Sequence, residues 1–358
     1  MNIRRLRGFA AGRTLVLGAV LALAVPGSAY ANTVSETVKT PGATSGPTSA
    51  NSEISTHADC SAGLVSGGGI NQAIGTGASV NGNHVNGTAP SSNGTSEYTG
   101  STGVVGTDVT HWLGIGGSGG QVNASFSTTP YAVCFTSNLV NHTQVVMNKA
   151  TTPTTAATVG LVVATCPANT RLLGGGARTT PGNTGSLKTI ASFPTFNNSA
   201  HDYGQKAAAD GETNPDSWAA VGWDSGANSG NTTYAYAICS GSGINVSGAT
   251  VTVRHSEVSG PTTGSAGQAA TVGCGGNDGK LVSGGAAISG GSVTTTDFTG
   301  PGSGGDHLNG SFPSTSGGTA VSDGTTTAAY WTASAHTGGQ SSPGTSTDAW
   351  VLCANDGV

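Results

Sequence analysis

The side chains that could carry chemistry in this chain of 358 residues are few and scattered. A Gly-x-Ser-x-Gly pattern, which can present a serine nucleophile between a strand and a helix, occurs around Ser118, but it lies in a glycine tract that no helical pattern follows. None of the eight histidines belongs to a His-Glu-x-x-His zinc motif. The sequence therefore predicts no catalytic residue, no metal site and no cofactor.

Two histidines do occupy matching positions. His84 begins the run His-Val-Asn-Gly and His307 begins His-Leu-Asn-Gly, whereas the corresponding run in the middle of the chain begins with Lys188. The missing third histidine favours a structural or surface role over catalysis. Asp306 also starts the Asp-x-Leu-x-Gly cadence of calcium-binding nonapeptide repeats, but here it is isolated, whereas those sites need tandem copies.

Carboxylates gather in the middle of the chain. Glycoside hydrolysis needs two carboxylates at a defined spacing, so this acidic stretch is where a hydrolase site would be sought. A solvated acidic loop explains the same residues more simply. The stretch comprises Asp202, Asp210, Glu212, Asp216 and Asp224.

The six cysteines reveal how the chain is organised. They form three sequential pairs with separations of 74, 73 and 79 residues, at Cys60 and Cys134, Cys166 and Cys239, and Cys274 and Cys353. Each pair encloses the same landmarks in the same order: an apolar dipeptide leading into glycines, a small-hydroxyl-x-proline segment and a tryptophan. The tryptophans are Trp112, Trp218 and Trp331, and they precede the closing cysteine by 22, 21 and 22 residues.

This periodicity predicts three homologous repeats at 32–138, 139–242 and 243–358. Six cysteines allow fifteen pairings, and one bridge within each repeat is the simplest. Each bridge would close a long loop, worth about 4 kcal/mol in the chain-entropy model. With 60 glycines and abundant Thr, Ser and Val, short strands and turns are favoured over helices, which predicts an all-β fold.

The N-terminus has the pattern of an export signal. Four arginines precede an apolar stretch at 15–25 that is too short to span a bilayer, and Ala29-Tyr30-Ala31 supplies a cleavage site. Removal of residues 1–31 leaves eight basic residues against 17 acidic ones, a formal net charge of −9. We therefore expect an extracellular protein, secreted or associated with the cell surface, with no remaining membrane span and no affinity for nucleic acid.

Aromatic side chains outside the expected core are the candidate ligand contacts. Trp223 lies five residues after Trp218 and so faces the opposite side of a continuous strand, and Gly117 and His336 take its place in the other repeats. A second group of aromatic residues lies three positions before the closing cysteines, at Tyr131, Tyr236 and Trp350. By the same alternation these side chains face away from the cysteines. The candidate binding residues are Trp223, His336, Trp350, Tyr236 and Tyr131.

The block from Cys166-Pro167 through Ser192-Phe193-Pro194 and Trp218 to Cys239 resembles repeats of uncharacterised secreted actinobacterial proteins. The plan of three disulfide-closed β units is similar to the three-sided β-prism of vitelline membrane outer layer proteins, although the units here are longer. This resemblance implies a prism. Few linker residues separate the units, since a strand-like stretch at Gly243-Ile244-Asn245-Val246 follows soon after Cys239, so we expect a compact array or a pseudo-threefold assembly, with a string of independent units as the alternative.

The functional expectation is a non-enzymatic protein that engages an extracellular glycan or cell-wall polymer through repeated β units, with affinity gained by multivalency. A structural or assembly protein of the cell surface is the alternative, because the chain combines low charge with disulfides. A secreted hydrolase that uses the acidic residues of the second repeat is the second alternative.

Overall fold

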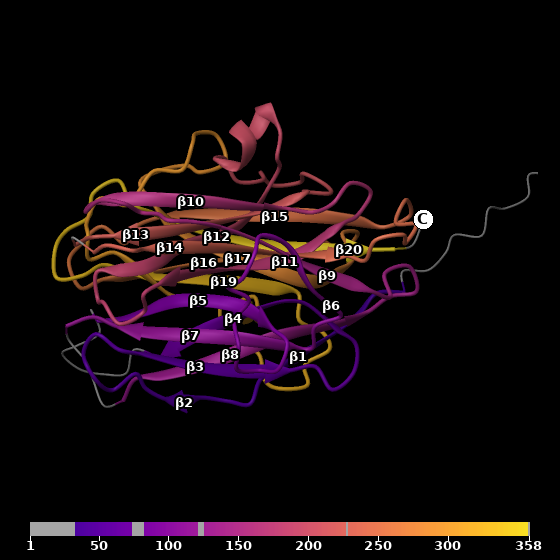
Figure 1. Ribbon diagram of the computed structural model, residues 1–358, viewed down its shortest axis with the longest axis horizontal. Coiled ribbons are helices and arrows are strands. Elements are labelled where there is room, and N and C mark those ends of the chain that lie inside the picture. The colour runs from indigo at the N-terminus through magenta and orange to yellow at the C-terminus, as the bar shows by residue number, and fades with distance from the viewer. Residues whose placement is uncertain (1–32, 74–81, 121–124, 227, 357–358) are drawn as a thin grey trace, which may run out of the picture.

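The computed structural model describes residues 33–73, 82–120, 125–226 and 228–356, so the predicted export signal at 1–31 lies outside the described residues. These segments fold into antiparallel strands, with one short 3-10 helix projecting from the body (Figure 1). The prediction of an all-β protein is confirmed.

The strands follow one another along the chain, joined by tight turns and by several longer loops. Residues 33–138 hold β1 (Ser35–Lys39), β2 (Thr44–Ser45), β3 (Glu53–Asp59), β4 (Leu64–Ala73), β5 (Asn83–Ser91), β6 (Gly103–Thr107), β7 (His111–Ser118) and β8 (Ser127–Thr136). Residues 139–242 hold β9 (Thr143–Ala150), β10 (Thr158–Thr165), β11 (Leu172–Thr180), β12 (Leu187–Thr195), helix η1 (Ser199–Gly204), β13 (Ser217–Asp224) and β14 (Thr232–Ser240). Residues 243–358 hold β15 (Thr250–Ser259), β16 (Gly267–Gly273), β17 (Lys280–Ser289), β18 (His307–Ser314), β19 (Tyr330–His336) and β20 (Ser346–Asn355).

Three antiparallel sheets share these strands, and each sheet takes strands from two of the predicted repeats. Their orders are β1-β8-β4-β18-β19-β16 with β2 beside β8, β3-β7-β5-β11-β14-β9-β6, and β10-β13-β12-β17-β20-β15. The glycine-rich strand of one repeat always pairs with the proline-containing strand of another, as in β4 with β18, β11 with β5 and β17 with β12. The strands run along the long axis of the molecule (Figure 1).

The two central strands of every sheet also contact central strands of the other two sheets. The three sheets therefore enclose one shared interior, and the chain is a closed three-sided assembly instead of a string of separate units. We call the line about which the six central strands gather the central axis.

The repeated tryptophans lie in this interior, as predicted. Trp218 has no exposed surface, and its indole covers Gly175, where an added Cβ would lie 2.3 Å from the Trp218 Cγ atom. No real Cβ approaches a neighbour so closely, so only glycine fits. The same contact joins Trp112 to Gly68 and Trp331 to Gly284.

At the central axis the backbones of the three glycine-rich strands meet. The strand register places Gly67, Gly174 and Ser283 at equivalent positions. A Cβ on Gly67 would lie 2.1 Å from the Ser283 Oγ, and a Cβ on Gly174 would lie 2.3 Å from the same atom. The axis has room for one small side chain, and Ser283 supplies it.

The disulfides join Cys60 to Cys134, Cys166 to Cys239 and Cys274 to Cys353, with Cα–Cα distances of 5.5, 5.7 and 5.8 Å. The predicted pairing is confirmed. Each bridge links a strand of one sheet to a strand of the next, because a repeat is divided between two sheets. The disulfides therefore hold together the two halves of each repeat.

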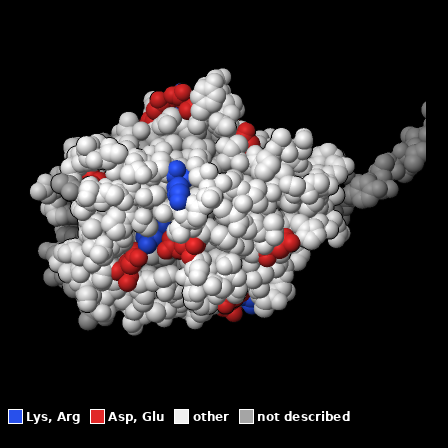
Figure 2. Space-filling view, in the orientation of Figure 1, with Lys and Arg blue, Asp and Glu red and all other residues white. Residues whose placement is uncertain are grey.

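A buried arginine of the second repeat forms ion pairs with two glutamates of the first. Arg178 on β11 is 3% exposed, and its guanidinium donates to Glu97 Oε2 at 3.0 Å and to Glu53 Oε1 at 2.9 Å. The third nitrogen donates to the carbonyl of Thr179 at 2.9 Å. Charged groups are otherwise thinly scattered, as Figure 2 shows for one face of the molecule.

Substitution of the glycine beneath an indole should be costly. We expect Gly175→Ala to lower the free energy of unfolding by about 3 kcal/mol, because the added methyl group overlaps the Trp218 ring and the Tyr236 carbonyl, which are both fixed. Urea denaturation measures the change. Gly100→Ala is the control, since nothing lies within 4 Å of its Cβ position, and equal effects of the two substitutions would contradict the packing argument.

Loss of the buried arginine should weaken the joint between repeats. Arg178→Met leaves the partly exposed carboxylates of Glu53 and Glu97 close together without a counter-ion, and we expect a loss of about 2 kcal/mol. The control Lys39→Met breaks a more exposed pair with Asp323 at 3.8 Å and should cost less than about 0.5 kcal/mol. Thermal unfolding of both variants measures the difference. Similar melting temperatures of the two variants would contradict the claim that Arg178 stabilises the contact between the first and second repeats.

Candidate functional site

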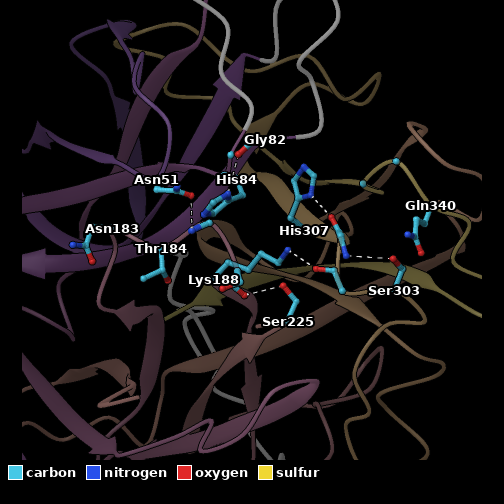
Figure 3. A pocket seen from close by; sticks show the side chains of 18 residues that line it. Asn51, Gly82, His84, Asn183, Thr184, Lys188, Ser225, Ser303, His307 and Gln340 are labelled. Carbon is cyan, nitrogen blue, oxygen red and sulfur yellow. Dashed lines mark hydrogen bonds between the residues drawn. The ribbon is translucent and has the colours of Figure 1, made fainter. Parts of the chain in front are cut away.

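A cavity of about 840 Å³ opens at one end of the prism, where the proline-containing strands β5, β12 and β18 begin (Figure 3). Its described lining consists of glycine backbone, the amides of Asn51, Asn183 and Gln340, the hydroxyls of serines and a threonine, and three basic side chains. No aliphatic or benzene-type ring side chain belongs to that described lining. The cavity is therefore built to form hydrogen bonds.

The three basic side chains are His84, Lys188 and His307, and they form the cavity floor. They come from the three predicted repeats and hold equivalent positions, since each is the cross-strand partner of the residue aligned in sequence: Gly117, Trp223 and His336. The His84 and His307 rings lie 6.3 Å apart. The fold thus brings the three aligned residues His84, Lys188 and His307 together in one cluster, which we call the axial cluster.

Both histidines of the axial cluster have a defined tautomer. Nδ1 of His84 lies 3.0 Å from the carbonyl oxygen of Gly82, and Nδ1 of His307 lies 2.7 Å from that of Gly305. A carbonyl oxygen can only accept, so each Nδ1 carries the hydrogen and each Nε2 holds a lone pair. Neither Nε2 has a hydrogen-bond partner among the described residues.

These imidazoles are neutral at physiological pH. Burial, assisted by the charge of Lys188, lowers the pKa of His84 to about 4. Burial and the same lysine place the pKa of His307 well below its usual value. Two uncharged hydrogen-bond acceptors therefore lie at the floor of the cavity, each with almost no exposed surface.

Lys188 supplies the donor of the axial cluster. Its ammonium donates to the carbonyl oxygen of Gly304 at 2.9 Å. Burial lowers the pKa of Lys188 to about 8, against the opposing attraction of Asp306, so the amine stays mostly protonated at pH 7. Asp306 is itself buried, accepts hydrogen bonds from the Ser342 hydroxyl and the Ser303 amide, and leaves Oδ1 without a partner among the described residues.

The aromatic residues predicted to be exposed ligand contacts are all buried, so that expectation of exposure is wrong. Tyr131, Tyr236 and Trp350 face away from the disulfides as predicted, but loops or strands of another repeat cover that face. The ring of Tyr131 meets Phe312 at 6.2 Å, and the Tyr236 hydroxyl donates to the carbonyl of Tyr98. The side chains concerned are Trp223, His336, Trp350, Tyr236 and Tyr131.

Two of these five residues nevertheless border the axial cluster. His336 pairs across the strands with His307, their rings are 5.6 Å apart, and its own Nδ1 faces the carbonyl of Thr337. Trp223 is the cross-strand partner of Lys188 and packs on Gly300. Aligning the repeats therefore identified the correct position along the strands. The side chains that line the cavity, however, belong to the neighbouring strand, opposite Trp223 and His336.

The acidic residues of the second repeat do not converge on one site. Asp224 is fully buried and accepts hydrogen bonds from the backbone of Gly226 and Asn228 and from the side chain of Asn231. Glu212 accepts from the backbone of Ala209 and contacts a histidine. Asp216 and Asp210 receive backbone hydrogen bonds as well. These carboxylates hold loops in place.

Within the described residues, no cluster of three or more His, Cys, Asp or Glu side chains is arranged to hold a metal ion. None of the helices in the described segments has the length and hydrophobicity needed to cross a membrane. Neither a protein-family model nor a curated protein sequence matches this chain.

The buried histidines should make the fold sensitive to acid. His84 titrates near pH 4 when folded and near 6.5 when unfolded, so its contribution is present above pH 6.5 and is lost as the pH falls through 4. That loss amounts to about 3 kcal/mol. We expect His84→Gln to reduce the decline in unfolding free energy between pH 7 and pH 4 by this amount. His142→Gln, which removes an exposed ring, serves as the control and should leave the decline unchanged.

Proposed function

We propose that this chain is a non-enzymatic binding protein that acts outside the cell and engages an extracellular glycan or cell-wall polymer through the axial cavity. The observation that carries the proposal is the cavity lining, in which the described side chains offer only amide, hydroxyl, imidazole and ammonium groups beside glycine backbone. Such a lining suits a ligand whose surface is rich in hydroxyl groups.

The floor of the cavity offers the pattern that a sugar needs. A hydroxyl group both donates and accepts, and the axial cluster provides two acceptors, Nε2 of His84 and of His307, beside the donor ammonium of Lys188. Because these groups are buried, a ligand at the cavity floor would reach them after a small shift of the floor or through a bridging water. Leaving them unsatisfied in the complex would be unfavourable, which favours a polar ligand over an apolar one.

The arrangement is also rigid. The three side chains stand on strands of different sheets, and those strands are held by the central packing of glycine and tryptophan. Groups fixed in this way lose little conformational freedom on binding. The three repeats contribute to one composite cavity, so the interaction we propose is a single site at the end of the prism and replaces the expectation of separate repeated sites.

Glycan-array screening followed by calorimetric titration tests the proposal. We expect a polysaccharide fragment to bind the wild-type chain, and Lys188→Met to weaken it at least tenfold by removing the donor while keeping the side-chain volume. Asn183→Ala and Gln340→Ala, at exposed positions of the rim, should each weaken binding by about 1 kcal/mol without affecting folding.

Tyr203→Ala is the matched control, because Tyr203 is an exposed aromatic residue on η1, outside the cavity lining. Its affinity should equal that of the wild-type chain. Absence of glycan binding together with sedimentation as large assemblies would favour the structural protein of the cell surface. Binding that survives all three cavity substitutions would show that the ligand sits elsewhere.

A further inference from the structure

A second cavity, of about 380 Å³, lies where the first repeat meets the third, next to the disulfide of Cys274. It is lined by Glu36 of β1, by the start of β17 with Lys280, and by the glycine-rich turn before that strand. The turn includes Gly276, whose Cβ position faces open space. This cavity shares no lining residue with the axial cavity and takes no part in the function proposed above.

Glu36 is unusual among the buried carboxylates. Its residue is 3% exposed, and neither carboxylate oxygen accepts a hydrogen bond from another described residue. The nearest cation is the ammonium of Lys280, 3.9 Å from Oε2 and beyond hydrogen-bonding distance. By comparison, buried Asp278 receives two short hydrogen bonds from Arg254, and buried Asp348 lies 2.9 Å from Nε2 of His255.

The carboxylate nonetheless stays charged at neutral pH. Burial raises the pKa of Glu36 to about 6, and the charge of Lys280 opposes that rise. An ionised carboxylate held away from water gains strongly from a partner that brings both charge and hydrogen-bond donors. Glu36 therefore borders the cavity with both oxygens almost fully covered, and its own backbone amide is the one hydrogen-bond donor that serves the carboxylate among the described residues.

We propose that this cavity binds a small ligand through a primary ammonium group, with the Glu36 carboxylate as its counter-ion. An ammonium group that enters as Lys280 moves aside offers three N–H donors, enough for the two carboxylate oxygens, which accept from no other described residue, and for a backbone carbonyl of the glycine-rich turn. A divalent metal ion fits less well, because it needs several oxygen ligands and no second carboxylate lines this cavity among the described residues.

Lys280 supplies the second element of the site. Its side chain is about half exposed, and its ammonium is not hydrogen-bonded to Glu36, so it can swing towards solvent when another cation enters. While it remains nearby, it competes with the ligand for the same negative charge. Removal of this lysine should therefore strengthen binding, whereas a merely structural ion pair would show no such response.

Titration of the full-length protein with propylammonium chloride, followed by NMR, tests the proposal. The amide signals of Gly275, Gly276 and Gly279 should shift and saturate in the millimolar range. Glu36→Gln should weaken the interaction at least tenfold, and Lys280→Met should tighten it several-fold. The control Asp297→Asn removes an exposed carboxylate that also lies 3.9 Å from a lysine, and it should leave the affinity unchanged.

Tetramethylammonium provides the second probe, since it carries the same charge without any N–H donor. It should bind at least tenfold more weakly than propylammonium. The proposal is overturned if propylammonium causes no saturating shifts, if Glu36→Gln binds it as the wild type does, or if tetramethylammonium binds equally well. Glu36→Gln removes a buried charge at nearly constant side-chain volume and should fold normally, which its melting temperature verifies. Failure of glycan binding in the axial cavity would leave this result untouched.

Discussion

The structure depends on the contact between a tryptophan indole and the backbone of a glycine on the neighbouring sheet. Beneath Trp112, Trp218 and Trp331, the glycine-rich strands approach so closely that a methyl group would overlap the ring. Each tryptophan belongs to one sheet and each covered glycine to the next, so this contact fixes the distance between the two sheets that a repeat spans. A large apolar surface is buried without a large side chain opposite it, and three strands can then meet at the central axis.

The axial cluster is a product of this geometry. His84, Lys188 and His307 are far apart along the chain, and each begins a strand that borders the central axis. Because the sheets close on one another, three equivalent positions become neighbours around one cavity. The low pKa of His84 follows from the same cause, since the closed packing removes water and places a lysine charge close by.

Much of this could be predicted from the sequence because the repeats present the same pattern three times. The repeated pattern identified the disulfide pairs and the equivalence of His84, Lys188 and His307, and the large area of an indole predicted that the repeated tryptophans are buried. The exposure predicted for Tyr131 and its counterparts was wrong because alternation along a strand reports only which face a side chain occupies, not what covers that face. The covering segments belong to another repeat. The burial of the Glu36 carboxylate beside Lys280 likewise depends on a distant strand, β17, which no local pattern reveals.

The pairing of β4 with β18 has a consequence for how the chain must assemble. During synthesis from the N-terminus, β4 is made early and β18 near the end. Until β18 is made, the glycine-rich strand β4 therefore has one unpaired edge. Open strand edges of this kind invite pairing with other chains. Closure of the first sheet is therefore a late event, and a chain truncated before β18 lacks a complete first sheet however well its first two repeats have formed.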